Sequence, residues 1–296
     1  MQGVTLDVIM LGIFGIERHP VPGSPERRLR RAIRAMLELS TRPEARLAEL
    51  LYEDREEATG PLRAILAYLD RHIYAIIAAR RQAERGTDVL SILLDATTET
   101  GEKLTDEELR NELLTLVLAG HETTANSLAW IFERLLRTPH AYDRLRDEVR
   151  SRDGGAEYVE ATIHEGMRSR PVIPIIGRNV MVPWRLGDYE VPAGSSVLMS
   201  ILLVHHRDDV YPEPFQFRPE RFLGRKPGTY TWIPFGGGIR RCLGGALAMA
   251  EQRVVLSAIA RRTDMVAPDP RPEHARHRNV TMIPAHGGRV AVTAKS

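Results

Sequence analysis

The stretch that most restricts the fold is Phe235-Gly236-Gly237-Gly238-Ile239-Arg240-Arg241-Cys242-Leu243-Gly244, which holds the only cysteine among the 296 residues. Three successive glycines let the backbone turn tightly and bring its N–H groups close to the sulfur. Helix-forming residues 246–251 follow just after this stretch. The cysteine is therefore expected near a helix N-terminus, where the helix dipole favours the thiolate form.

Two interpretations of Cys242 are open at this point. Free cysteines are among the most buried residue types, so an isolated Cys242 would be an inert core residue. The glycines before it, the helix after it and the charges of Arg240 and Arg241 favour a thiolate instead. A thiolate of this kind is a soft, electron-rich metal ligand.

The order Phe-x-x-Gly-x-Arg-x-Cys-x-Gly is filled without a mismatch by Phe235, Gly238, Arg240, Cys242 and Gly244. It resembles the haem-binding loop of the cytochrome P450 family. The resemblance implies a haem b cofactor with Cys242 as the proximal iron ligand. It also implies that Arg240 holds a haem propionate and that Phe235 belongs to the cofactor site.

A long apolar helix is predicted from Thr105, where a capping box begins, to about Arg137. Its middle reads Ala119-Gly120-His121-Glu122-Thr123-Thr124, a poor choice for a core. A small-residue packing notch is one interpretation, and a groove that admits oxygen and water beside a cofactor is the other.

The segment resembles the oxygen-activating helix of the same family, with the pattern Ala/Gly-Gly-x-Asp/Glu-Thr-Thr/Ser. That resemblance implies that Ala119 and Gly120 give the flat haem room. Glu122 and Thr123 would be the acid–alcohol pair that delivers protons during oxygen activation. His121 lies about 100° round the helix from either neighbour, so we expect it to pack or bond elsewhere.

Glu165 and Arg168 are three residues apart on a predicted helix, so their side chains can meet. Together they resemble the Glu-x-x-Arg motif of the family, and Arg221 in Pro219–Phe222 matches its third member. The implied role is structural, to brace the cysteine loop. Arg178 matches the arginine that binds a haem propionate in the family; the alternative is an ordinary surface strand residue.

The apolar spacing is mostly helical over residues 1–170, and residues 171–296 contain short β-rich runs and irregular connections. We expect strands at 172–176, 178–182, 189–191 and 195–199, and a hairpin between 280–283 and 289–292. The predicted fold class is mainly α, a cytochrome P450-like single domain over 1–296 with small β-sheets. Val4 to Gly15 resembles a helix well inside family members, so we expect the N-terminal part of the fold to be absent.

Composition restricts the partners. Lys+Arg 41 against Asp+Glu 39 leaves a net charge of +2, which does not indicate nucleic acid. The sequence contains no run of about 18 apolar residues, so it does not predict a membrane-spanning helix. One cysteine fits a reducing compartment, so a cytoplasmic location is expected, and the arginine-rich composition suggests a bacterial source.

The predicted activity is that of a haem-thiolate monooxygenase, which inserts one oxygen atom from O2 into a hydrophobic organic substrate. Electrons would come from a separate ferredoxin and ferredoxin reductase or a similar donor. Arg240 and Arg241 suggest that this donor is acidic. Two alternatives stay open: a truncated, catalytically inactive haem-binding remnant, and a peroxide-using enzyme, against which Glu122 and Thr123 argue.

Overall fold

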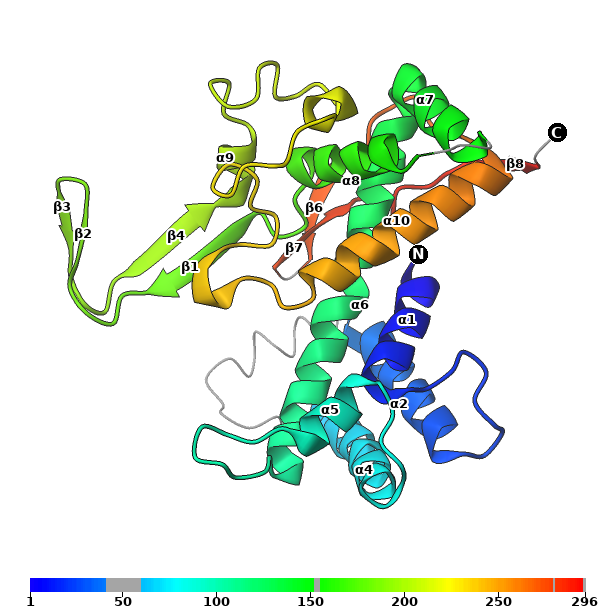
Figure 1. The fold of residues 1–296 in the computed structure, drawn as a ribbon, viewed down its shortest axis with the longest axis vertical. Coiled ribbons are helices and arrows are strands. Elements are labelled where there is room, and N and C mark those ends of the chain that lie inside the picture. The colour runs from blue at the N-terminus through cyan, green and yellow to red at the C-terminus, as the bar shows by residue number, and fades with distance from the viewer. Residues whose placement is uncertain (41–59, 152–154, 279, 295–296) are drawn as a thin grey trace. The chain divides into compact units, whose positions relative to one another are not determined.

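The computed structural model describes residues 1–40, 60–151, 155–278 and 280–294. The chain divides into two compact units, Gln2–Glu122 and Thr123–Ser296, with Met1 grouped with the second. Figure 1 traces the chain through both units, which we describe separately. A single domain over residues 1–296 stays a prediction.

The first unit is helical in its described residues. It contains α1 (Gln2–Phe14), α2 (Pro25–Ser40), α4 (Gly60–Gln82), α5 (Val89–Asp95) and the first part of α6 (Asp106–Leu136). The apolar residues of these helices form one buried cluster, which includes Phe14, Leu29, Ile77, Leu90 and Leu113. The helix expected at Val4 to Gly15 is therefore confirmed as α1, about half of whose residues are buried in this core.

Helix α6 begins at the predicted capping box. The Glu108 carboxylate accepts the backbone N–H of Thr105 at 2.8 Å, and the Thr105 hydroxyl accepts the N–H of Glu108 at 3.2 Å. These reciprocal bonds satisfy N–H groups that have no partner inside the helix. The long helix predicted from Thr105 to Arg137 is confirmed, with bounds one residue inside the expectation at each end.

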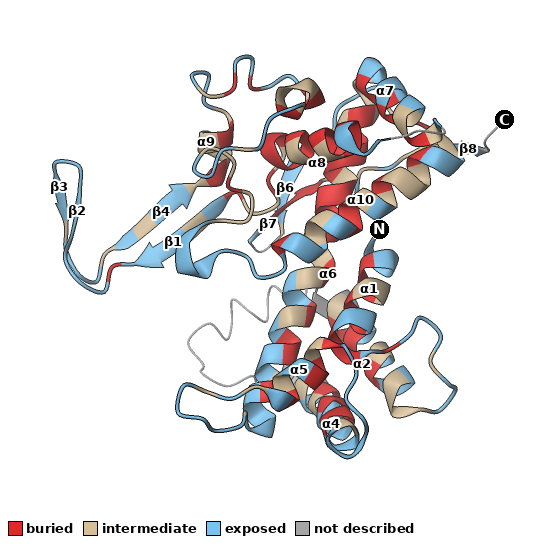
Figure 2. Cartoon of the chain, viewed as in Figure 1, coloured by how far each residue is buried: buried red, intermediate tan, exposed pale blue. Residues whose placement is uncertain are grey.

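The second unit packs its helices around another apolar core. The later part of α6 meets α7 (Pro139–Arg150), α8 (Glu157–Ser169) and α10 (Gly245–Arg262). Helix α8 is buried along most of its length, as the red colour in Figure 2 shows. Short helical turns occur at α9 (Ile201–His205), η1 (Pro219–Phe222) and η2 (Gly238–Arg240).

The described strands of this unit form two-stranded antiparallel sheets. The pairs are β1 (Ile175–Asn179) with β4 (Ser196–Ser200), β2 (Trp184–Leu186) with β3 (Tyr189–Val191), β5 (Thr263–Val266) with β8 (Ala291–Ala294), and β6 (Ala275–Arg278) with β7 (Thr281–Pro284). The runs expected at 172–176 and 178–182 are one strand, β1. The mainly α class with small sheets is confirmed.

The predicted hairpin between 280–283 and 289–292 is wrong. Strand β7 pairs with β6, and β8 pairs with β5, which directly follows α10. The reason lies in the turn between β7 and β8, where the Glu273 carboxylate accepts the N–H groups of His286 and Gly288. These bonds tie the turn to the segment before β6, so β8 leaves toward another strand.

Among the helices of the described residues, none combines the length and apolar character needed to cross a bilayer.

Candidate functional site

The cysteine loop is closed by backbone hydrogen bonds. The N–H of Cys242 donates to the carbonyl of Phe235 at 2.9 Å, and that of Arg241 donates to Gly238 at 3.1 Å. Gly236 and Gly238 have φ values of 67° and 66°, in the left-handed region that only glycine adopts without strain. Helix α10 then begins at Gly245. The loop therefore presents the Cys242 thiol, which is free and exposed.

The surroundings of this thiol are apolar and basic. Ile239 is 103% exposed and Leu243 is 87% exposed, although both are large apolar side chains. Arg240 is also exposed, and the described residues give it no carboxylate partner. Exposed apolar groups beside a cation fit an apolar cofactor that carries anionic substituents.

A metal held by Cys242 would need further ligands from outside the described chain. Over the described residues, no group of three or more His, Cys, Asp and Glu side chains could hold a metal ion. A thiolate is a soft ligand that suits iron. The donor set therefore fits a prosthetic group that brings its own metal ligands, such as haem, with Cys242 as the single protein ligand.

The predicted bracing motif is confirmed as a contact. Arg168 donates two hydrogen bonds to the Glu165 carboxylate, at 2.7 and 2.8 Å, and both side chains are 0% exposed. Arg221 lies 3.5 Å from the same carboxylate, as the resemblance implied for the third member. Burial lowers the pKa of Arg221, while Glu165 raises it. Buried charges persist only when they are paired in this way.

This three-residue clamp extends toward the cysteine loop. Arg168 also donates to the carbonyl of His205 at 2.8 Å, and the His205 ring Nε2 accepts the N–H of Ile233 at 2.9 Å. Burial and the nearby Arg168 lower the pKa of His205 to about 3, so this imidazole is neutral. His205 thus joins the clamp to the segment that leads into the loop, a role that its sequence position alone did not indicate.

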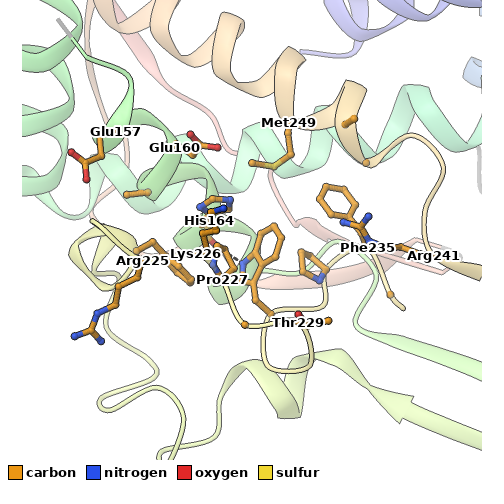
Figure 3. A pocket seen from close by; sticks show the side chains of 18 of the residues that line it. Glu157, Glu160, His164, Arg225, Lys226, Pro227, Thr229, Phe235, Arg241 and Met249 are labelled. Atoms are coloured by element: carbon orange, nitrogen blue, oxygen red, sulfur yellow. Dashed lines mark hydrogen bonds between the residues drawn. The ribbon is translucent and has the colours of Figure 1, made fainter. Parts of the chain in front are cut away.

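Phe235 is half-buried and connects the loop to its surroundings. A Cβ atom added at Gly245 would lie 3.4 Å from the Phe235 ring, so the glycine allows the ring to pack on the start of α10. Phe235 also borders a groove of about 1050 Å³ between α8, residues 222–236 and α10. Figure 3 shows Phe235, His164 and Met249 around this groove, with Arg241 beside Phe235.

Arg178 lies on β1, in the same unit as the cysteine loop. Its side chain is exposed, and its guanidinium donates to the carbonyl of Gly177 at 2.7 Å. A Cβ atom at Gly236 would lie 3.8 Å from Ile176, two residues before Arg178. Residues two apart on a strand point to the same face, so Arg178 shares the face of β1 that borders the loop.

The predicted distal residues lie along α6. Ala119, Gly120 and Glu122 belong to the first unit, and Thr123 begins the second. Ala119 is exposed, and Glu122 and Thr123 are half-buried. Thr115, Leu118, Ala119 and Glu122 share one face at helical spacing, and the first three are exposed.

Gly120 has a packing reason of its own. A Cβ atom there would come within 2.4 Å of Ile9 on α1, so the glycine permits close approach of α1 and α6. His121 is buried, and its ring Nε2 lies 3.1 Å from the carbonyl of Gln2, as expected for a residue that bonds elsewhere. The packing notch is thus observed at Gly120, and the cofactor role of Ala119 and Gly120 stays a prediction.

A mainly helical chain with small two-stranded sheets, an exposed thiol on a glycine loop and a buried Glu-x-x-Arg clamp are together typical of haem-thiolate proteins. The family model described as "Cytochrome P450" matches residues 1–291. The chain belongs to the cytochrome P450 family.

Individual relatives agree with this assignment. The chain is 40% identical over 295 residues to "Putative cytochrome P450 137" of Mycobacterium tuberculosis (strain CDC 1551 / Oshkosh), covering 98% of this chain and 60% of that protein. It is 38% identical to "Putative cytochrome P450 138" of Mycobacterium bovis, covering 99% and 66%. The chain thus spans about three fifths to two thirds of the length of these relatives.

A solved structure, the crystal structure of the cytochrome P450DA heme domain, superposes with a TM-score of 0.79 at 26% identity. The match covers 100% of this chain and 67% of that one.

Proposed function

We propose that the chain is a haem-thiolate monooxygenase that uses O2 and a hydrophobic organic substrate, with electrons from a separate ferredoxin system or similar donor. One oxygen atom would enter the substrate and the other would leave as water. The observation that carries the proposal is the closed glycine loop that exposes Cys242, in a chain of the cytochrome P450 family. When bound, the haem b would supply the redox and oxygen chemistry.

The residues of the cysteine loop would bind and orient the cofactor. Cys242 would be the proximal iron ligand, and Ile239 and Leu243 would cover the apolar ring and exclude water. Arg240 and Arg178 would hold the propionates, each through a charge-assisted hydrogen bond worth about 1.5–3 kcal/mol. Both arginines are exposed and have no carboxylate partner among the described residues, which supports this assignment.

On α6, Glu122 would hold and release protons, and the Thr123 hydroxyl would donate a hydrogen bond into the space where O2 reacts. Ala119 would leave room for the cofactor, and its exposed position supports this role. Arg240 and the exposed Arg241 would attract an acidic electron donor. A cytoplasmic location stays a prediction.

The inactive remnant considered as an alternative has no support in the comparisons with known proteins. The peroxide-using alternative is disfavoured by the Glu122–Thr123 pair, because such chemistry does not need protons for O2 activation. The substrate is proposed only as hydrophobic.

Replacing Cys242 with alanine tests the iron ligand. The reduced, CO-bound protein should show the red-shifted Soret band of thiolate ligation, and Cys242→Ala should lose it because no other thiol exists in the chain. Circular dichroism of the variant should be unchanged, which separates loss of ligation from loss of fold. A Cys242→Ala protein that keeps the band would refute the assignment.

Replacing Thr123 with alanine tests proton delivery. We expect an unchanged haem spectrum, while electron consumption shifts from product toward hydrogen peroxide. Positioned proton donors contribute about 10²–10⁴-fold, so a loss of coupling of about tenfold or more is expected. The measurement is product and peroxide formed per electron donor consumed, with Thr124→Ala as the neighbouring control. Equal coupling in wild type and Thr123→Ala would contradict the role.

A further inference from the structure

Trp232 lines the groove that Phe235 also borders, between α8, residues 222–236 and α10. Its indole Nε1 donates a hydrogen bond to the carbonyl of His164 on α8 at 3.0 Å. Its ring meets the His164 imidazole edge-on, with the centroids 4.8 Å apart. Its backbone N–H donates to Gly228 at 2.9 Å. Trp232 is therefore fixed to α8 by a hydrogen bond and by ring packing.

The same indole reaches the cysteine loop through Phe235. The two rings pack edge-on with their centroids 5.9 Å apart. The carbonyl of Phe235 accepts the N–H of Cys242 at 2.9 Å, the bond that closes the loop. One aromatic side chain thus stands between helix α8 and the residue that holds the backbone of Cys242.

The clamp fixes the neighbouring residue as well. His164 directly precedes Glu165, and Ile233, which follows Trp232, donates to His205, whose carbonyl binds Arg168. Residues 232 and 233 are therefore both held by α8 and its buried ion pair. Beyond Phe235 and outside the turn η2, the described backbone hydrogen bonds of residues 236–242 are Gly236 N–H to Ile233, Arg241 N–H to Gly238 and Cys242 N–H to Phe235.

We propose that Trp232 is a positioning residue for Cys242, which transmits the rigidity of the α8 clamp through Phe235 to the backbone of the thiolate ligand. The role rests on the proposed function of Cys242 as the iron ligand. Partners that orient a metal ligand tune the affinity and the reduction potential of the metal, although they do not touch it. Trp232 touches neither substrate nor reacting atoms in this assignment.

The chain offers a matched control in Trp130. Its indole Nε1 also donates to a backbone carbonyl at 3.0 Å, that of Met282, and its ring is fully buried in the same unit. Replacing either tryptophan with phenylalanine removes one indole–carbonyl hydrogen bond. Of these two tryptophans, only Trp232 has a described ring contact with Phe235. A general loss of structure should therefore appear in both Trp232→Phe and Trp130→Phe, whereas an effect on the position of Cys242 should appear only in Trp232→Phe.

The test compares Trp232→Phe, Trp232→Leu and Trp130→Phe by amide hydrogen exchange of residues 235–244, with and without haem. We expect Trp232→Leu to speed exchange of this segment by about fivefold or more, the effect of losing one hydrogen bond and a ring contact. Trp232→Phe, which keeps a ring, should have a smaller effect. Trp130→Phe should leave this segment unchanged.

In the haem-loaded protein, the Trp232 variants should also shift the reduction potential in the same order, at equal haem content. Unchanged exchange and potential in Trp232→Leu, or equal changes in Trp130→Phe, would overturn the proposal. If the leucine variant does not fold, Trp232→Phe and Trp232→Tyr give the same comparison. A Cys242→Ala protein that keeps the thiolate Soret band would refute the proposed function. The exchange experiment on the haem-free protein does not depend on that result, because it measures the effect of the Trp232 contact on residues 235–244 directly.

Discussion

Two regions of the second unit differ in which side chains they bury: one buries charged side chains, and the other exposes apolar ones. In the clamp around α8, Glu165 and Arg168 are completely buried and every charge has a partner. In the strands from β1 to β4, large apolar side chains face outward, with Leu198 72% exposed and Tyr189 77% exposed. Of these two regions, only the exposed strands carry a residue of the proposed haem site, Arg178, so burial does not mark the functional residues here.

The register of the β2–β3 hairpin explains why apolar side chains gather on one of its faces. Trp184 pairs with Val191 and Leu186 with Tyr189, so these four apolar side chains share one face. Arg185 pairs with Glu190 on the other face. The clamp concentrates polar groups inside, whereas the hairpin presents an apolar face outside. We therefore expect substitutions in the clamp to act on stability, and those in the strands to act on binding.

The largest effect on stability is expected at Arg168. Arg168→Leu leaves the buried Glu165 carboxylate without its main partner, which typically costs about 3–5 kcal/mol of unfolding free energy. Urea denaturation measures the loss. Arg271→Leu is the matched control, because Arg271 pairs with Asp269 on the surface with side chains 84% and 49% exposed. That pair should contribute about 1 kcal/mol or less. Similar losses at both sites would contradict the distinction between the clamp and the surface.

The next largest effect is expected at Glu251 on α10, which should make the free energy of unfolding depend on pH. It is 7% exposed, and its Oε1 atom has no hydrogen-bond partner among the described residues. Burial raises the pKa of Glu251 from 4.5 to about 7. Between these values the folded chain keeps a proton that the unfolded chain has lost. The contribution of Glu251 is therefore fully present below about pH 4.5 and is lost as the pH rises toward 7.

Each pH unit in that window should lower the free energy of unfolding by at most about 1.4 kcal/mol. Glu251→Gln should flatten this slope and make the protein more stable than wild type above pH 7. Denaturant titrations at several pH values measure it, with the exposed Glu99→Gln as control. A slope that persists in Glu251→Gln would show that another group is responsible.

The clamp and the start of α6 could be predicted from the sequence, but other parts of the fold and site could not. The clamp was predictable because Glu165 and Arg168 lie at helical spacing and Arg221 occurs in a matching segment. The capping box at Thr105 depends only on neighbouring residues, so its bonds were also correct. The Glu165–Arg168 pair and the capping box each lie within about one turn of helix, so their spacing in the sequence predicts them directly, whereas Arg221 was predicted from the resemblance to the family.

Contacts between distant residues were not predictable in the same way. The partners of β7 and β8 depend on Glu273 binding a turn that follows β7, which no periodicity reveals. Trp232 and His205 act through contacts with backbone carbonyls and N–H groups, which any residue type supplies. The cofactor role expected of Gly120 stays a prediction, but its contact with Ile9 could not be assigned from the sequence, because helix packing also selects glycine.

The smallest effect on stability is expected at Arg178, in the exposed strands. Among the described residues its side chain bonds only the neighbouring Gly177 carbonyl, so Arg178→Ala should change the unfolding free energy by about 0.5 kcal/mol or less. Its proposed bond to a haem propionate predicts that the same substitution weakens haem binding. The variant should release haem to a haem-scavenging protein about tenfold faster, consistent with a charge-assisted bond of 1.5–3 kcal/mol. Arg185→Ala on β2, whose guanidinium also bonds a nearby carbonyl, that of Gly187, is the control. Equal release from both variants would make Arg178 an ordinary surface residue, whereas selective release would show that an exposed strand can bind a cofactor without stabilising the fold.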